Sequence, residues 1–173
     1  EKQKKLREEI DRVLGAKLPA EEDRPNLPYT EATIMEVMRY SSMLPLGLLH
    51  RTTSNVVIGG HYIPKNTLVV GNLHAVHHDQ KTWGDANYFR PERFLSSDET
   101  TLVKHEAFIP FSIGKRVCIG ETLAKTELYL FITSIFQKFE VTWDPSEPKP
   151  SLEPVTSLIS APQPHKLVFT ERL

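Results

Sequence analysis

The chain has 173 residues and a formal net charge of −1, so its length is that of about one domain. A chain that is nearly neutral lacks the excess of basic residues that binds nucleic acid, and we expect no nucleic-acid partner. No apolar run approaches the roughly 20 residues of a membrane-spanning helix. A single cysteine excludes a disulfide within the chain.

Two helices are expected in the first 42 residues. Residues 1–14 are charged, with apolar side chains at helical spacing, and residues 17–27 form a polar loop. A second helix should begin at Pro28 and run to about Ser42, because Pro45 forbids its continuation. The first methionine, Met35, falls inside this helix, and we therefore expect the chain to begin in mid-protein.

The second helix contains Glu36-Val-Met-Arg39. Side chains at i and i+3 share a helix face and can pair. Taken alone, the pattern favours an exposed ion pair, which stabilises a helix by only a few tenths of a kcal/mol.

Residues 44–70 predict a small antiparallel sheet. Short β-branched runs alternate with Gly59-Gly60 and with a Pro-Lys-Asn turn, as in a tight hairpin. Next, His74, His77 and His78 share a helix face, but only Asp79 adds a carboxylate. We expect a hydrogen-bonded or solvated helix end there, and no metal site.

The last third predicts one long helix and a closing sheet. Residues 121–138 should be helical and point Leu123, Leu130, Phe131 and Ile135 inward. A strand is expected at residues 139–143, followed by a proline-rich turn. Residues 155–172 suit a closing hairpin with its tip at residues 157–161.

The only cysteine, Cys118, lies directly before the long helix, in the sequence Phe-Ser-Ile-Gly-Lys-Arg-Val-Cys-Ile-Gly over residues 111–120. The helix dipole and unpaired N–H groups favour a thiolate at this position. One thiolate suits a metal already held on its other sides, as iron is in haem. The alternative is a buried free cysteine that opens an ordinary helix.

The spacing Phe-x-x-Gly-x-Arg-x-Cys-x-Gly resembles the haem-binding loop of the cytochrome P-450 superfamily of haem-thiolate monooxygenases. The resemblance implies a haem b cofactor with Cys118 as the axial ligand of its iron. Phe111 would shield the sulfur, Gly114 would allow a sharp turn, and Gly120 would let the helix approach the porphyrin. Arg116 would pair with a haem propionate.

The same resemblance gives the Glu-x-x-Arg pattern a second interpretation. The superfamily locks such a pair with an arginine from a later Pro-Glu-Arg-Phe stretch, which stands here at residues 91–94. Glu36, Arg39 and Arg93 would then form a buried structural triad. Its implied role is to fix the loop that carries Cys118.

Residues 49–67 resemble the corresponding stretch of microsomal members of the second family. Two positions depart from the usual pattern: Leu49 replaces a common proline, and Asn66 replaces a glycine in a turn. Asn tolerates positive φ, so the turn should survive. His50 would donate to a haem propionate. The implied substrate-lining residues are apolar and include Leu44, Leu46, Leu48, Leu49 and Leu158.

The resemblance thus implies a mainly α fold with small antiparallel β-sheets. Residues 1–173 would be the C-terminal, proximal haem-side portion of a single cytochrome P-450 domain, without the N-terminal part and the distal helix. The implied partners are an NADPH-dependent reductase, cytochrome b5 and an apolar small molecule, and Lys115 and Lys125 could meet an acidic redox partner. The implied location is the cytosolic face of the endoplasmic reticulum membrane, reached through the absent N-terminal part.

The implied reaction inserts one oxygen atom from dioxygen into the substrate, with electrons from the reductase. Two alternatives remain. One is a haem-thiolate isomerase or dehydratase that acts on peroxides, and the other is a non-catalytic, truncated haem-binding fragment. We expect the 173-residue fragment to be inactive by itself.

Overall fold

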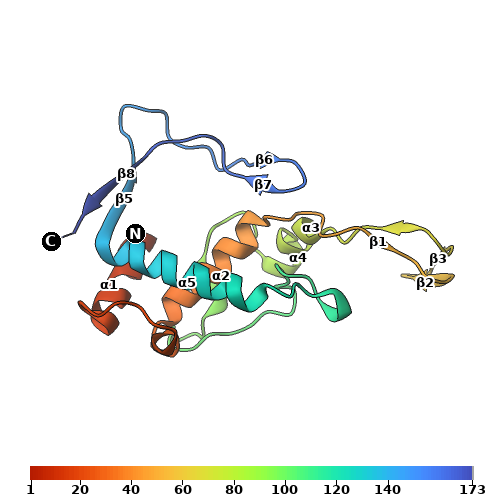
Figure 1. Cartoon of the computed structure of the whole chain (residues 1–173), viewed down its shortest axis with the longest axis horizontal. Helices are drawn as coiled ribbons and strands as arrows, with labels where there is room; N and C mark the ends of the chain where they lie inside the picture. The colour runs from red at the N-terminus through yellow and green to blue at the C-terminus, as the bar shows by residue number, and fades with distance from the viewer. Residues whose placement is uncertain (173) are drawn as a thin grey trace.

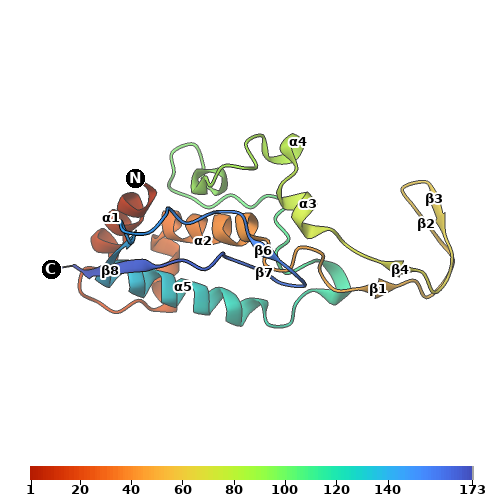
Figure 2. The same cartoon turned by 90° about the horizontal axis from the view of Figure 1, so that it is seen from above.

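The computed structural model describes residues 1–172 as a helical body with an arm of short strands at one end. Helices α1 (Lys2–Leu14), α2 (Pro28–Ser41) and α5 (Glu121–Lys138) pack against one another in the body (Figure 1). The first and the last described residues lie at the end away from the arm (Figures 1 and 2). The architecture is mainly α with small antiparallel sheets, which confirms the predicted fold class.

Helix α1 is amphipathic, and the carboxylate of its residue Glu9 caps the N-terminus of α2. Leu6, Ile10 and Leu14 are buried against the body. Glu9 is also buried, and it accepts hydrogen bonds from the backbone N–H groups of Tyr29 and Thr30 at 2.9 and 2.7 Å. These are among the N–H groups that a helix leaves unpaired in its first turn, so a remote carboxylate stabilises the start of α2.

The loop before α2 is more ordered than the sequence predicted. Residues Glu21–Asn26 form a 3₁₀ helix, η1. The carboxylate of Asp23 accepts the Ala20 N–H at 3.0 Å, a local bond that favours a tight turn. Helix α2 then runs from Pro28 to Ser41. Ser42 follows as its C-cap, with a left-handed φ of 38° that stops the helix.

The arm consists of two antiparallel pairs of strands. Strand β1 (His50–Arg51) pairs with β4 (Leu68–Val69), and β2 (Val56–Ile58) pairs with β3 (His61–Ile63). Gly59 and Gly60 turn the hairpin at φ values of 56° and 83°, as a two-residue hairpin loop requires. Asn66 has φ 68°, so the turn survives the replacement of glycine as predicted.

Three short helices connect the arm to the segment that precedes the cysteine. Asn72 caps α3 (Leu73–His77) and Asp79 caps α4 (Gln80–Trp83), each through a side-chain oxygen that accepts a backbone N–H. The Pro-Glu-Arg-Phe stretch forms the 3₁₀ helix η2 (Pro91–Phe94), which packs against α2.

The predicted inward face of α5 is wrong. Leu123 and Phe131 are 64% and 65% exposed and Ile135 is 36% exposed, while Leu130 is half-buried. The buried residues are Tyr129 and Thr133. This helix is apolar on both faces, a pattern typical of helices inside larger proteins, so periodicity could not select the face.

The closing hairpin is also different from the prediction. Strand β8 (Leu167–Glu171) pairs with β5 (Phe139–Trp143), and a separate small hairpin joins β6 (Val155–Thr156) to β7 (Ser160–Ala161). The Ser160 N–H donates to the Met43 carbonyl at 2.8 Å, which holds this hairpin against the chain that follows α2.

The core lies where α1, α2, α5 and the residues around η2 meet. Its fully buried members include Ile10, Leu27, Ala32 and Phe94. Within residues 1–172, the structure contains no helix with both the length and the apolar character needed to cross a membrane.

Candidate functional site

The loop that carries Cys118 contains a short 3₁₀ helix, η3 (Gly114–Arg116), just before the cysteine, and α5 begins three residues after it. The Cys118 N–H donates to the Phe111 carbonyl at 3.0 Å, and the Cys118 carbonyl accepts the Glu121 N–H at 3.3 Å. The first bond closes the loop and the second continues into α5. The thiol therefore stands at the N-terminus of an 18-residue helix, as predicted.

The backbone of this loop needs residues that tolerate left-handed φ. Gly114 has φ 75°, a conformation that side chains with a Cβ adopt only at a cost. Ser112 has φ 65° and was not singled out by the sequence. A Cβ added to Gly120 would lie 3.8 Å from the Cys118 sulfur, so this glycine leaves the side of the sulfur open.

The surroundings of the thiol are exposed, apolar and cationic. Cys118 is free and exposed, which contradicts the buried cysteine of the alternative interpretation. Ile113 is 67% exposed and Ile119 is fully exposed, although both are large apolar residues. Arg116 is exposed beside them, and Phe111 is half-buried.

This arrangement fits a planar apolar group with carboxylates and a metal at its centre. Among residues 1–172 no group of three or more His, Cys, Asp or Glu side chains is placed to hold a metal ion. A bare ion at Cys118 would therefore lack ligands, whereas haem iron brings its own equatorial ones. The apolar residues match the ring, and Arg116 matches a carboxylate.

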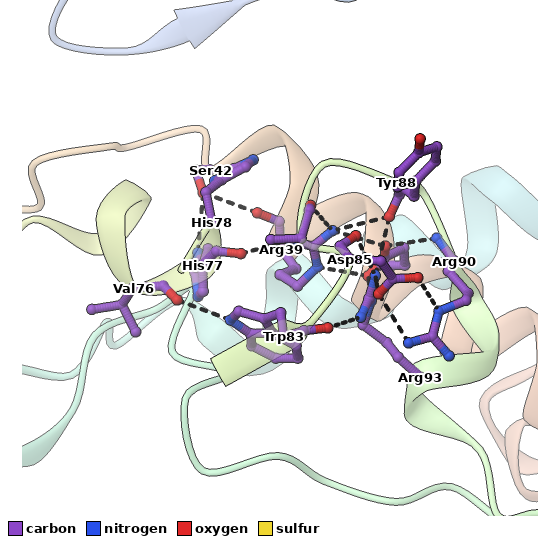
Figure 3. Close-up of polar contacts among 12 residues, drawn as sticks. Arg39, Ser42, Val76, His77, His78, Trp83, Asp85, Tyr88, Arg90 and Arg93 are labelled. Carbon is purple, nitrogen blue, oxygen red and sulfur yellow. Dashed lines mark hydrogen bonds and ion pairs between the residues drawn. The ribbon is translucent and has the colours of Figure 1, made fainter. Parts of the chain in front are cut away.

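Glu36 and Arg39 of α2 contact Arg93 of η2, and Figure 3 labels the two arginines. Both guanidiniums reach Glu36, with Nε of Arg39 and of Arg93 at 2.8 and 3.0 Å from the same carboxylate oxygen, Oε2. Arg39 binds bidentately, since its Nη2 donates to Oε1 at 2.9 Å. The Glu36 and Arg39 side chains are 0% exposed and that of Arg93 is 4% exposed, so the contact is a buried network rather than a surface pair.

The two arginines also hold the backbone of residues 77–88. Arg39 donates to the carbonyls of His77 at 2.6 Å and Ala86 at 3.0 Å, and Arg93 donates to those of Trp83 and Tyr88. Such bonds satisfy the remaining guanidinium donors, which a buried charge requires. The network thus fixes the chain between α3 and η2.

His77 connects this network to the segment before the cysteine loop. Its ring is fully buried, with Nδ1 3.1 Å from the Ser42 hydroxyl and Nε2 accepting the Ile109 N–H at 3.1 Å (Figure 3 labels His77 and Ser42). Burial, aided by the positive charge of Arg39 and by the neighbouring histidines, lowers the pKa of His77 to about 4. The sequence placed His77 at a helix end but gave no signal for this connection, because Ser42 and Ile109 are remote in the chain.

The remaining predicted residues lie toward the arm. His50, on β1, is exposed, as are Leu46, Leu48 and Leu49. Leu158, at the tip of the β6–β7 hairpin, is 71% exposed, and the bond from Ser160 to Met43 brings this tip beside the leucine-rich segment. In both views the Cys118 loop and β1 lie beyond the end of α2 (Figures 1 and 2).

The two lysines predicted to meet a redox partner differ. Lys115 is exposed in η3. Lys125 pairs with Glu121 at 2.5 Å within α5 and lies 5.7 Å from the centre of the Phe111 ring.

Comparisons with known proteins match nearly the whole chain. The family model described as Cytochrome P450 matches residues 1–169. Cytochrome P450 2U1 of Bos taurus is 46% identical over 171 residues, which cover 98% of this chain and 31% of that protein. Cytochrome P450 2K6 of Danio rerio is 42% identical over 172 residues, covering 98% of this chain and 34% of that protein. Cytochrome P450 1A2 of Felis catus is 46% identical over 161 residues, covering 91% and 31%. The chain thus spans about a third of the length of the curated relatives it matches.

Proposed function

Because this chain belongs to the cytochrome P450 family, we propose that the full-length protein that contains it is a haem-thiolate monooxygenase. It inserts one oxygen atom from dioxygen into an apolar small organic molecule. The observation that carries the proposal is the free, exposed Cys118 at the start of α5, set among exposed apolar and cationic residues.

Haem is the cofactor of this family, and the residues around Cys118 fit it. When bound, the haem supplies the oxygen-activating chemistry, which a thiolate ligand favours by donating electron density. Cys118 is the iron ligand, and Gly114 and Gly120 shape the loop around its sulfur. Arg116 binds a haem propionate, and Phe111 limits the access of water to the sulfur.

His50 donates a hydrogen bond to a haem propionate. It is exposed on β1, at the same end of the molecule as the Cys118 loop. A hydrogen-bond donor there complements a carboxylate that would otherwise face apolar surface.

We infer an apolar substrate because the side chains of residues 44–49, which follow α2 and would line its binding site, are mainly aliphatic. Leu46, Leu48 and Leu49 are 49%, 69% and 69% exposed, a degree of apolar exposure that marks a binding surface. Leu44 and Leu158 complete this lining from the same segment and from the hairpin held beside it.

Electrons come from an NADPH-dependent reductase, with cytochrome b5 as a second donor. The exposed Lys115, three residues before Cys118, suits an acidic partner at the thiolate side of the haem. The protein works at the cytosolic face of the endoplasmic reticulum membrane, to which residues outside this chain attach it.

The test is turnover by the full-length protein reconstituted with an NADPH-dependent reductase. Incubation with labelled dioxygen and a panel of apolar organic compounds should give products that contain one labelled oxygen atom, with NADPH consumed. Cys118→Ser is the matched control, since it replaces only the sulfur, and it should abolish product formation.

Other outcomes would replace the proposal. Conversion of peroxides without reductase or NADPH would indicate a haem-thiolate isomerase or dehydratase. Haem binding without any turnover would indicate a non-catalytic haem-binding protein. We expect the 173-residue chain alone to be inactive, since it leaves Ile119 and Phe131 exposed and spans about a third of its relatives.

A further inference from the structure

The carbonyl and both ring nitrogens of His77 are hydrogen-bonded to residues remote from it in the chain. Its carbonyl accepts from Arg39 of the triad at 2.6 Å, and its Nδ1 meets the Ser42 hydroxyl at 3.1 Å. Its Nε2 meets the N–H of Ile109 at 3.1 Å. One buried residue therefore joins α2, α3 and the segment that leads to the cysteine loop.

The partners of the ring determine where its proton lies. The Ile109 N–H can only donate, so Nε2 has to be unprotonated. The neutral ring then carries its proton on Nδ1 and donates it to the Ser42 oxygen, while the Ser42 hydroxyl donates onward to the Arg39 carbonyl at 2.9 Å. In this row of hydrogen bonds, every donor faces an acceptor only when the His77 ring carries its proton on Nδ1.

The path from Ile109 to the thiol is short. Ile109 stands two residues before Phe111, and the Phe111 carbonyl accepts the Cys118 N–H at 3.0 Å. The Phe108 ring adds a contact on the same segment, with its centre 6.3 Å from that of His77. An anchor on Ile109 therefore limits how far the cysteine loop can move relative to the triad.

We propose that His77 is a positioning residue, whose neutral Nε2 holds the Ile109 backbone and thereby the loop that presents Cys118. The proposal rests on the role of Cys118 as haem ligand given above. It extends the role of the triad: Arg39 and Arg93 hold the backbone of residues 77–88, and His77 transmits that position to the cysteine loop.

The charges around the ring favour its neutral state. Arg39 lies on α2, and His74 and His78 lie on the histidine's own helix and its cap; each disfavours a positive ring. Glu36 is held by two arginines and is not free to pair with it. His105, on the segment before the loop, lies instead against Trp83 in a tilted arrangement, with 4.3 Å between ring centres.

Two conservative variants separate the two ring bonds. The amide of glutamine reaches the place of Nε2, so His77→Gln can still accept from Ile109. The amide of asparagine reaches only the place of Nδ1, so His77→Asn can still donate to Ser42. Each variant loses one neutral hydrogen bond, and comparable losses of stability are expected.

The variants are compared in the full-length protein by the rate of haem loss to an excess of a haem-scavenging protein. His77→Asn should lose haem about tenfold faster, an effect typical of residues that orient a metal ligand indirectly. His77→Gln should stay close to the unchanged protein. Equal haem loss in the two variants at equal unfolding free energy would overturn the proposal.

Two further readouts do not depend on haem. The ring nitrogen chemical shifts of His77 should show an unprotonated Nε2, and hydrogen exchange of the Ile109 amide should be faster in His77→Asn than in His77→Gln. A protonated Nε2, or equal exchange, would overturn the proposal even if Cys118 binds haem. Absence of a thiolate-type spectrum in the unchanged protein would instead refute the role of Cys118. The nitrogen chemical shifts and the Ile109 exchange rate do not test that role.

Discussion

Replacing Arg39 by alanine should be far more damaging than replacing a similar arginine at the surface. Arg39→Ala leaves the fully buried Glu36 with one guanidinium instead of two, and leaves the His77 and Ala86 carbonyls without their donor. Breaking a buried ion pair costs about 3–5 kcal/mol. A domain is typically stable by about 5–15 kcal/mol, so roughly a fifth or more of that stability is at risk.

Arg24→Ala is the matched control. Arg24 binds Glu31 bidentately, with both N···O distances at 2.8 Å, but its side chain is 21% exposed. Pairs that water can reach contribute about 0.2–1 kcal/mol. Each arginine binds its main carboxylate bidentately, but only Arg39 is fully buried and holds backbone carbonyls, while Arg24 has a second, exposed partner in Glu21.

The assay is urea unfolding of the full-length protein, followed by circular dichroism, together with its haem content after purification. Arg39→Ala should lower the unfolding free energy by at least about 3 kcal/mol and abolish haem retention although Cys118 is unchanged. A loss no larger than that of Arg24→Ala, or a normal haem content, would refute the structural role of the triad.

Two further predictions concern other buried groups. Glu9→Gln keeps the size of the capping side chain but removes its charge from the start of α2, and it should lower the unfolding free energy by about 1–2 kcal/mol in the same urea assay; an unchanged midpoint would contradict the capping role. Acidification should destabilise the protein through His77, because burial holds its pKa at about 4, below the ordinary value of 6.5. The folded state then binds fewer protons than the unfolded state between these values, so stability present above pH 6.5 is lost as the pH falls toward 4, by at most about 3 kcal/mol. His77→Gln should lack this component of the pH dependence, and a profile equal to that of the unchanged protein would contradict it.

The sequence was most informative where a local pattern decides the structure. The helical spacing of residues 1–14, the proline that opens α2 and the paired glycines of the β2–β3 hairpin all specify their own conformation, and each element lies where it was predicted. The position of Cys118 before α5 follows in the same way from adjacent residues.

Tertiary contacts were harder to predict. The face of α5 could not be chosen, because Leu123 and Phe131 are as apolar as the residues that the helix buries. The pairing of β8 with β5 depends on strands separated by a long loop, and periodicity carries no information on such pairing. The bonds of His77 join residues 32 and 35 positions apart, so no spacing in the sequence indicated them.

The central claim is that Cys118 binds haem iron through its thiolate. The most direct measurement is the ferrous–CO difference spectrum of the full-length protein, recorded beside Cys118→Ser. We predict a thiolate-type Soret band in the unchanged protein and its loss in the variant, because only the sulfur differs. A thiolate-type band that persists in Cys118→Ser, or free-haem absorption in the unchanged protein, would contradict the claim.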